Sequence, residues 1–273
     1  MAERESCNKW FDEWFNDGDF WEQYAPIMFD AKRWAEVPAV ADGITRMARL
    51  PLYEYPPEYK QAEAGAPGGP RTADLCCGFG RISLELARRG FAVTGVDLTP
   101  AYLDTARDDA AYEHLEIEFV CEDVRGFKRP GAFDLAVNLY ISFGYFGSQE
   151  DDRLFARNVY ESLKDGGCFI IETLGKEIAV RDFVEAEWFE RAGYFVLTKY
   201  EAVNSWEGLK NRWILINKEG KKTDRVFTQR LYAATELRRL LLDAGFSAVE
   251  LYGNWEEGLY DQYAESLIAV GRK

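Results

Sequence analysis

Short apolar runs alternate with amphipathic segments through the middle of the chain. Runs typical of buried strands occupy residues 72–77, 91–96, 117–121, 133–137 and 168–173. Segments with helical spacing lie between them, notably from residue 81 and over 150–163. Such regular alternation predicts an α/β fold with right-handed crossovers and a parallel sheet. A helix over 235–243 and strands over 247–252 and 266–270 complete a sheet of seven strands.

The alternation breaks down between residues 188 and 232. Three runs with alternating apolar and polar positions, 194–200, 211–217 and 225–232, predict antiparallel strands. Residues 218–221 supply a hairpin turn between the second and the third of these runs. We therefore expect an inserted antiparallel β cap over 188–232, with the core formed by 71–187 and 233–273.

The N-terminal segment is rich in aromatic residues. Trp10 and Trp14, like Phe11 and Phe15, are four residues apart, as on one face of a helix. A polar break at 16–19 divides the segment, and Asp17 or Asp19 would cap the second helix. The pattern fits an amphipathic helix packed on the core, or a lid over a site. Residues 1–55 are thus a candidate helical lid, and the Pro- and Gly-rich residues 56–70 a flexible linker.

Polar residues stand at the ends of the first four core strands. The first strand ends in a turn that contains Gly78 and Gly80, where the absence of a side chain permits close approach of a ligand. Asp97 ends the second strand, where one carboxylate can receive two vicinal ribose hydroxyls. Asp123 and Asn138 follow the third and fourth strands. A nucleotide-like ligand is the natural candidate.

With these residues the chain resembles the class I S-adenosylmethionine-dependent methyltransferases, of the type that acts on small molecules. The resemblance is carried by Asp74, Cys76, Gly78 and Gly80, with Cys76 standing where the family pattern has its first glycine. It covers roughly residues 71–173 closely and the C-terminal strands by topology. It implies a Rossmann-like sheet whose last strand is antiparallel, S-adenosylmethionine as the cofactor, and transfer of its methyl group to a small-molecule acceptor.

The resemblance also implies roles for single residues. Asp97 would bind the ribose, Leu98 beside it would be a further cofactor contact, and Asp123 with the backbone of Val124 would lie at the adenine. The loop over 138–146 would face the methyl group, which makes Asn138 and Tyr140 the catalytic candidates; Asn138 would also contact the cofactor. Aromatic lid residues would attract the sulfonium by about 0.5–2 kcal/mol per contact, and the candidates for this contact are Trp21 and Tyr24.

Charge and composition narrow the function further. The chain has 33 basic and 47 acidic residues, a formal net charge of −14 and an isoelectric point near 4.7. This balance opposes binding to nucleic acid. The five cysteines show no C-x-x-C pair, and the one histidine, His114, falls in a connection between helix and strand, so we expect reduced thiols and no metal site. No apolar run is long enough to span a membrane and no leader opens the chain, which predicts a cytoplasmic protein.

The predicted β cap is basic on an acidic protein. Between Lys199 and Arg239 the sequence has ten basic and five acidic residues. Such charge most often belongs to a solvated sheet face; a homodimer contact, a docking surface for the acidic N-terminal segment, or a site for an anionic substrate group are the alternatives.

Other functions remain to be weighed against methyl transfer. An in-line displacement from a sulfonium needs few catalytic side chains, which agrees with the absence of a hydrolase triad or a Walker lysine. A dinucleotide oxidoreductase is disfavoured because an acidic residue precedes the glycines. Two alternatives stay open. One is attack at the aminopropyl carbon of the cofactor, for example cyclisation to azetidine-2-carboxylate with release of methylthioadenosine; the other is a non-catalytic cofactor-binding protein. The sequence names neither the acceptor nor the atom methylated.

Overall fold

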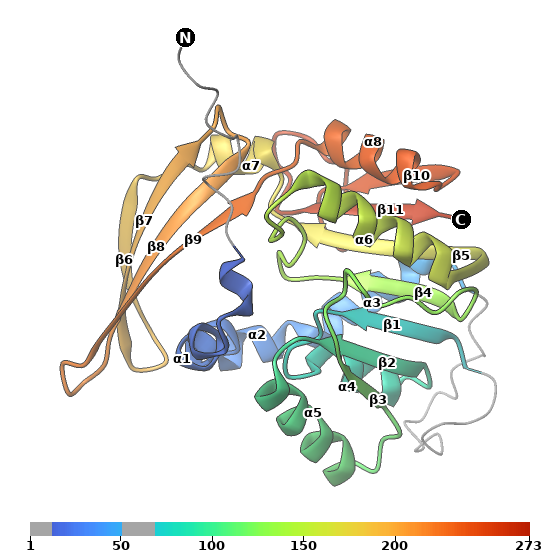
Figure 1. Ribbon diagram of the computed structural model, residues 1–273, viewed down its shortest axis with the longest axis horizontal. Helices are drawn as coiled ribbons and strands as arrows, with labels where there is room; N and C mark the ends of the chain where they lie inside the picture. Colours follow the sequence, from blue (N-terminus) through green and yellow to red (C-terminus); the bar gives the residue numbers. More distant parts are fainter. Residues whose placement is uncertain (1–12, 51–68) are drawn as a thin grey trace.

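The computed structural model of the protein describes residues 13–50 and 69–273. Within these residues the strands form two β-sheets. The larger sheet has seven strands in the order β10-β11-β5-β4-β1-β2-β3 (Figure 1). Its strands are β1 (Arg71–Leu75), β2 (Ala92–Asp97), β3 (Glu118–Cys121), β4 (Phe133–Asn138), β5 (Leu163–Thr173), β10 (Ala248–Tyr252) and β11 (Leu267–Arg272).

Strand pairing follows the predicted topology. Strands β1 to β5 pair in parallel, and β11 lies antiparallel between β5 and β10. The seven-stranded, Rossmann-like sheet and the antiparallel last strand are therefore confirmed. All five parallel strands end at the same edge, so the polar residues that follow them converge there.

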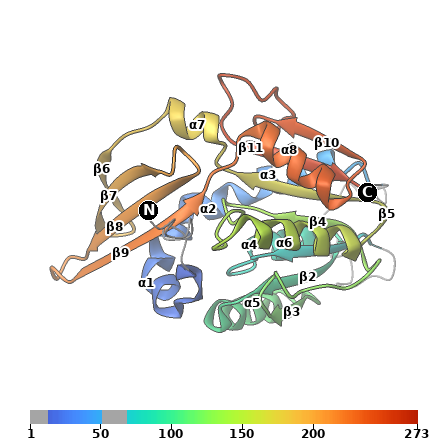
Figure 2. The same cartoon turned by 45° about the horizontal axis from the view of Figure 1, so that its top comes forward.

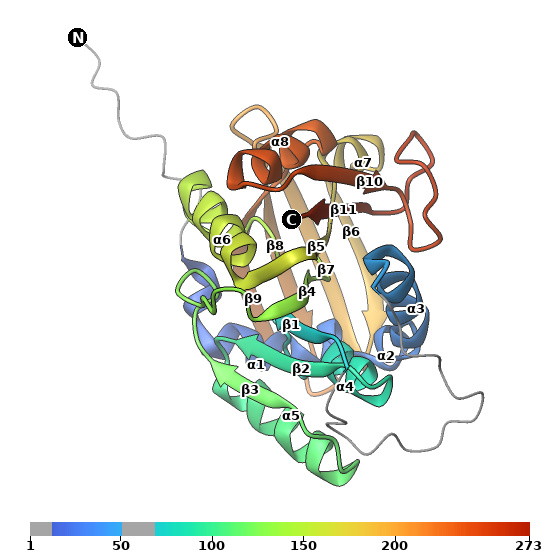
Figure 3. The same ribbon diagram turned by 90° about the vertical axis from the view of Figure 1, so that its right-hand side faces the viewer.

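Helices cover both faces of the sheet (Figure 3). Helices α6 (Gln149–Ser162) and α8 (Ala234–Ala244) pack on one face, against a core that includes Ala136. Helices α3 (Val37–Ala48) and α4 (Arg81–Arg88) pack on the other, with Leu135 and Val137. Because side chains on both faces of β4 are buried, its apolar residues form a nearly continuous run in the sequence rather than an alternating pattern. Helix α5 (Pro100–Tyr112) packs against β2 and β3.

The smaller sheet is antiparallel, as predicted, and stands beside the edge where the parallel strands end (Figure 2). It has four strands, β6 (Ala186–Arg191), β7 (Tyr194–Val203), β8 (Gly208–Ile216) and β9 (Lys222–Arg230). The sequence analysis predicted three strands and missed β6, because three of its six residues are charged. The short helix α7 (Lys176–Arg181) connects β5 to this cap.

The described N-terminal residues before α3 lie between the core and the cap. It forms a 3₁₀ turn (Trp14–Asn16), α1 (Gly18–Met28) and α2 (Ala31–Ala35). Asp17 caps α1 by accepting a hydrogen bond from the Phe20 N–H, which confirms one of the two predicted caps. Trp10, Phe11 and nearly all of the predicted linker 56–70 lie outside the described residues.

Candidate active site

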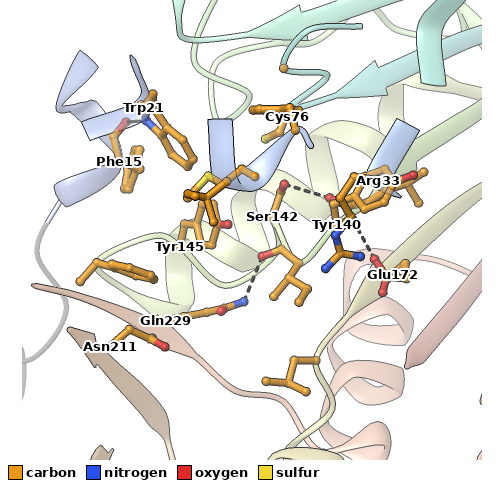
Figure 4. Close-up of a pocket in the computed structure, with 18 of the residues that line it drawn as sticks. Phe15, Trp21, Arg33, Cys76, Tyr140, Ser142, Tyr145, Glu172, Asn211 and Gln229 are labelled. Atoms are coloured by element: carbon orange, nitrogen blue, oxygen red, sulfur yellow. Dashed lines mark hydrogen bonds between the residues drawn. The ribbon is translucent and has the colours of Figure 1, made fainter. Parts of the chain in front are cut away.

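A cavity of about 520 Å³ lies between the strand ends of the core and the inner face of the cap (Figure 4). This volume is within the range of small-molecule sites. Its walls come from three regions: the turn after β1 and the ends of β2 to β5, the N-terminal helices, and strands β6 to β9. The cavity thus has a core end and a cap end.

The glycine turn and Asp97 hold each other at the core end. The Gly78 N–H donates to one carboxylate oxygen of Asp97 at 2.8 Å, and the Thr99 N–H donates to the other at 2.9 Å. Gly78 has a φ of +56°, and a Cβ there would come within 3.0 Å of the Phe29 ring. Burial raises the pKa of Asp97, which the two backbone donors oppose. The carboxylate still borders the cavity, as ribose binding requires.

Cys76 and Gly80 flank this turn but differ in role. Cys76 lines the cavity with a φ of +65°, and its N–H donates to the Val96 carbonyl at 2.8 Å. Gly80 does not line the cavity. A Cβ on Gly80 would lie 3.0 Å from Ala106 and 3.2 Å from Phe119. In the structure Gly80 lets α4 pack closely against α5 and β3, and its cofactor contact stays a prediction.

Asp74 is a buried carboxylate at the same end of the cavity. It is 3% exposed, lines the cavity, and accepts a hydrogen bond from the Ser83 hydroxyl at 2.6 Å. Burial raises its pKa to about 6, with a further contribution from neighbouring Asp97. A cationic ligand group would stabilise its charged form.

The three residues expected at the ribose and adenine border the cavity together. Leu98, Asp123 and Val124 all line it. The Asp123 carboxylate is held by the Arg125 guanidinium, and the hydrogen bonds from Arg125 hold the pKa of Asp123 below its usual value despite partial burial. Asp123 is therefore charged and fixed in place.

The two catalytic candidates separate in the structure. Asn138 is fully buried, is not among the lining residues, and donates from its side-chain amide to the Leu75 carbonyl at 2.9 Å. In the structure Asn138 ties the end of β4 to the end of β1, and its catalytic and cofactor contacts stay predictions. Tyr140 does line the cavity, and its buried hydroxyl has no hydrogen-bond partner among the described residues.

The two lid candidates also separate. Trp21 lines the cavity, and its indole N–H donates to the Phe15 carbonyl at 2.7 Å. Tyr24 is fully buried away from the cavity, and its hydroxyl donates to the Trp213 carbonyl at 2.7 Å. The Tyr24 ring packs between α1 and the cap, and its cofactor contact stays a prediction.

A strained loop after β4 is held by the side chains of Glu172 and Gln229, which the sequence analysis did not single out. Tyr140 and Ile141 have φ values of +54° and +67°, which is unfavourable for a β-branched residue. Glu172 accepts a hydrogen bond from the Tyr140 N–H at 2.8 Å, and the Gln229 amide donates to the Ile141 carbonyl at 3.0 Å. Figure 4 shows both contacts. Strand β9 thereby fixes the loop that carries Tyr140.

The remaining predictions concern the histidine, the cysteines, metal binding and membrane spans. His114 lies exposed in the turn after α5, with a φ of +57°. The cysteines within the described ranges are free. No group of three or more potential metal ligands occurs in residues 13–50 and 69–273, and no helix there is long and apolar enough to cross a membrane.

Comparisons with known proteins agree with this geometry. Residues 73–167 match the family model of a methyltransferase domain. A protein of Geobacillus sp. (strain WCH70) that is provisionally named a methyltransferase is 24% identical to this chain over 223 residues. The alignment covers 78% of this chain and 89% of the relative.

Solved structures extend the likeness to the whole chain. An S-adenosylmethionine-dependent methyltransferase from Clostridium acetobutylicum ATCC 824 has a TM-score of 0.74 at 16% identity, over 93% of this chain and 98% of that one. An amino pentose methyltransferase from Micromonospora echinaspora, solved with bound S-adenosylmethionine, has a TM-score of 0.64 at 19% identity, over 99% and 100%. These comparisons agree with the resemblance to methyltransferases and confirm the methyltransferase-like fold.

Proposed function

We propose that this chain transfers the methyl group of S-adenosylmethionine to a small-molecule acceptor bound between the core and the β cap. The observation that carries this proposal is the continuous cavity, which joins the ends of β1 to β4 to the inner face of β7 to β9. One ligand at each end would bring a methyl donor and an acceptor into the same enclosed space. The cofactor supplies an activated methyl group, so alignment and exclusion of water are the protein's main tasks.

At the core end, we assign cofactor binding to residues that line the cavity. Asp97 offers its carboxylate to the ribose, while its bonds to Gly78 and Thr99 hold the turn in shape. Asp123 and Val124 border the adenine side. Trp21 and its neighbours Trp14 and Phe15 close this region against water with packed aromatic rings.

At the cap end, two buried amides favour an acceptor that donates hydrogen bonds. Asn211 and Gln229 are 6% and 7% exposed and line the cavity. The Asn211 amide donates to the Leu209 carbonyl, and the Gln229 amide to the Ile141 carbonyl. Their N–H₂ groups are thus engaged, and their side-chain oxygens accept no hydrogen bond from residues 13–50 and 69–273. We therefore propose an amine or hydroxyl acceptor, which the amino pentose specificity of one structural relative supports.

The carboxylate of Glu172 adds to this acceptor side. Burial raises its pKa, and the Tyr140 N–H holds one of its oxygens. We assign Glu172 and Tyr140 to positioning the acceptor, since both line the cavity between its two ends.

The test is to incubate the purified protein with S-adenosylmethionine, with and without a metabolite extract, and to identify the adenosine-containing product by mass spectrometry. Extract-dependent S-adenosylhomocysteine, together with a methylated amine or alcohol, would support the proposal. Release of methylthioadenosine without extract would instead support attack at the aminopropyl carbon, and no turnover under either condition would support a non-catalytic protein.

Two further features belong to the proposal. A cytoplasmic location is supported by the free thiols of the described cysteines, since disulfides are favoured in oxidising compartments. A homodimer through the β cap is supported by its outer face, where Trp188, Phe195 and Leu197 are exposed on β6 and β7. Size-exclusion chromatography with light scattering, on the wild type and on Trp188→Glu, tests the dimer.

A further inference from the structure

Glu172, the last residue but one of β5, places a carboxylate in the cavity between its core end and its cap end. The Tyr140 N–H donates to one carboxylate oxygen at 2.8 Å (Figure 4). Within residues 13–50 and 69–273 no side chain donates a hydrogen bond to this carboxylate, and no cation forms an ion pair with it. An ionised carboxylate has about four acceptor sites, so most of its hydrogen-bonding capacity remains for a ligand.

The groups around Glu172 leave its charge uncompensated. Arg33 in α2 and Glu36 at the end of that helix act on it in opposite directions, and they pair with each other at 3.3 Å. Tyr140 and Tyr145 are the other titratable groups nearby, and burial raises the pKa of both, so neither ionises near neutral pH. Burial also raises the pKa of Glu172 itself. A cationic ligand group would stabilise the charged form of this carboxylate.

The cap adds hydrogen-bond acceptors beside this carboxylate. Ile141 links the two, because its N–H donates to the Glu172 carbonyl at 3.3 Å and its carbonyl accepts from the Gln229 amide at 3.0 Å. The side-chain oxygens of Gln229 and Asn211 accept no hydrogen bond in the described parts of the chain. The acceptor side of the cavity thus offers a carboxylate and two amide oxygens. An ammonium, with a positive charge and up to three N–H donors, matches this set better than a hydroxyl with one donor.

Methylation of an amine requires removal of a proton. An ammonium has no lone pair, and an alkylammonium with a pKa of about 10.4 is less than about 0.1% free amine at pH 7. A carboxylate in the site whose pKa lies above its usual value is suited to take this proton, and general bases typically contribute about 100- to 10,000-fold in rate. A hydroxyl acceptor is too weak an acid for a carboxylate to ionise.

We propose that the acceptor is a primary or secondary amine bound as its ammonium, and that Glu172 is the general base that takes its proton. This inference rests on the proposed function and names the acceptor class and the base of the same reaction. The N–H bond breaks as its proton moves to Glu172, the freed lone pair forms an N–C bond to the methyl group, and the electron pair of the S–C bond stays on sulfur. The products are a methylated ammonium, S-adenosylhomocysteine and a protonated Glu172, which returns its proton to solvent.

Calorimetric titration with three ligands tests the position of this carboxylate without a known acceptor. S-adenosylhomocysteine has a neutral sulfur, S-adenosylmethionine has a sulfonium without N–H donors, and sinefungin carries an ammonium in place of the methyl group. All three share the nucleoside and the amino-acid end, so titration of Asp74 cancels in the ratios of their affinities. For the wild type at pH 7.5 we expect sinefungin to bind about tenfold more tightly than S-adenosylhomocysteine. This ratio should fall towards one at acidic pH, where Glu172 becomes protonated.

Glu172→Gln is the informative variant, because its side-chain oxygen can still accept the Tyr140 N–H. We expect it to lose the tenfold preference for sinefungin at every pH, while S-adenosylhomocysteine and S-adenosylmethionine bind within about threefold of the wild type. Glu185→Gln is the matched control. Glu185 is exposed, lies near Lys199 and does not line the cavity, so this variant should keep the wild-type ratio.

A metabolite extract that supports methyl transfer adds a kinetic readout. At pH 7 we expect Glu172→Gln to form S-adenosylhomocysteine about 100-fold more slowly than the wild type, and to recover as pH rises above about 9, where amines lose their proton in solution. A rate equal to that of the wild type would contradict the role of Glu172 as a base.

Three other results would overturn the inference. Equal wild-type affinities for sinefungin and S-adenosylhomocysteine at every pH would do so without any variant. Equal weakening of S-adenosylmethionine and sinefungin in Glu172→Gln would show a counter-charge for the sulfonium instead of a base. Methylated alcohols as the only products would exclude an amine acceptor but leave the proposed function intact. Failure of the proposed function would appear separately, as a wild type that prefers sinefungin but forms no S-adenosylhomocysteine with the extract.

Discussion

The core end and the cap end of the cavity are built by different kinds of contact. At the core end, polar groups are fixed by backbone or side chains close in sequence: 19 residues separate Gly78 from Asp97, and nine separate Asp74 from Ser83. At the cap end, Gln229 reaches Ile141 across 88 residues, and Tyr24 reaches Trp213 across 189.

This difference separates two tasks. Parallel strand ends and a glycine turn form the core end of the site, and its geometry follows from the local fold. This geometry therefore does not depend on which acceptor binds at the cap end. The cap and the N-terminal helices decide what can approach it. We therefore expect substitutions at the core end to change cofactor affinity, and substitutions at the cap end to change turnover or stability while cofactor affinity stays constant.

The largest expected effect is at Asp97. Asp97→Ala removes the proposed ribose contact and the acceptor for the Gly78 and Thr99 N–H groups. We expect the affinity for S-adenosylhomocysteine, measured by calorimetry, to fall at least about 100-fold. Asp104→Ala on the surface of α5 is the control and should bind normally. Undiminished binding by Asp97→Ala would remove Asp97 from the site.

Asp74 gives the next largest effect and couples stability to pH. Burial raises the pKa of Asp74 in the folded protein to about 6, above that of an exposed aspartate, so the folded state holds a proton more tightly and stability falls as pH rises from about 4 to about 6. Asp74→Asn removes this cost. We expect the cofactor-free variant to be about 2–3 kcal/mol more stable than the wild type near pH 7.5, and the gain to shrink towards pH 4.

Urea denaturation across this pH range, with the free energy of unfolding extrapolated to water, measures the effect. The same variant should bind S-adenosylhomocysteine more weakly if the Asp74 carboxylate, which lines the core end of the cavity, contacts the cofactor. If Asp74→Asn has the same stability as the wild type at every pH, burial of the Asp74 carboxylate does not destabilise the folded protein.

Gln229 tests the cap end. Gln229→Leu removes the hydrogen bond to the Ile141 carbonyl and releases a strained loop. We expect kcat to fall about tenfold, because Tyr140 is less well positioned, with affinity for S-adenosylhomocysteine within about twofold of the wild type. Lys199→Ala on the outer face of the cap should change neither quantity. A drop in cofactor affinity without a change in kcat would contradict the division between the two ends.

The smallest expected effect is at Tyr24. Tyr24→Phe deletes the hydroxyl that donates to the Trp213 carbonyl but keeps the packed ring. We expect the free energy of unfolding to fall by about 1 kcal/mol, with no change in cofactor affinity. Weaker cofactor binding in Tyr24→Phe, with an unchanged free energy of unfolding, would show that the Tyr24 hydroxyl contributes to cofactor binding instead.

The core strands could be predicted because each depends mainly on its own residues. Strands β1, β2 and β4 are short apolar runs ended by polar residues, and parallel topology brings those ends to one edge. Strand β6 escaped prediction because three of its six residues are charged, so this edge strand has little apolar signal of its own. Its place in the sheet depends on pairing with β7.

The sequence by itself determined the sheet, the glycine turn and the carboxylates that stand at the strand ends, because these follow from periodicity and short-range contacts. Tertiary structure alone decided which polar side chains face the cavity. Asn138 turns to Leu75, Tyr24 turns to Trp213, and Arg81 is covered by rings from two other segments. Side-chain direction at these positions depends on contacts with distant parts of the chain, and a linear pattern carries no record of those contacts.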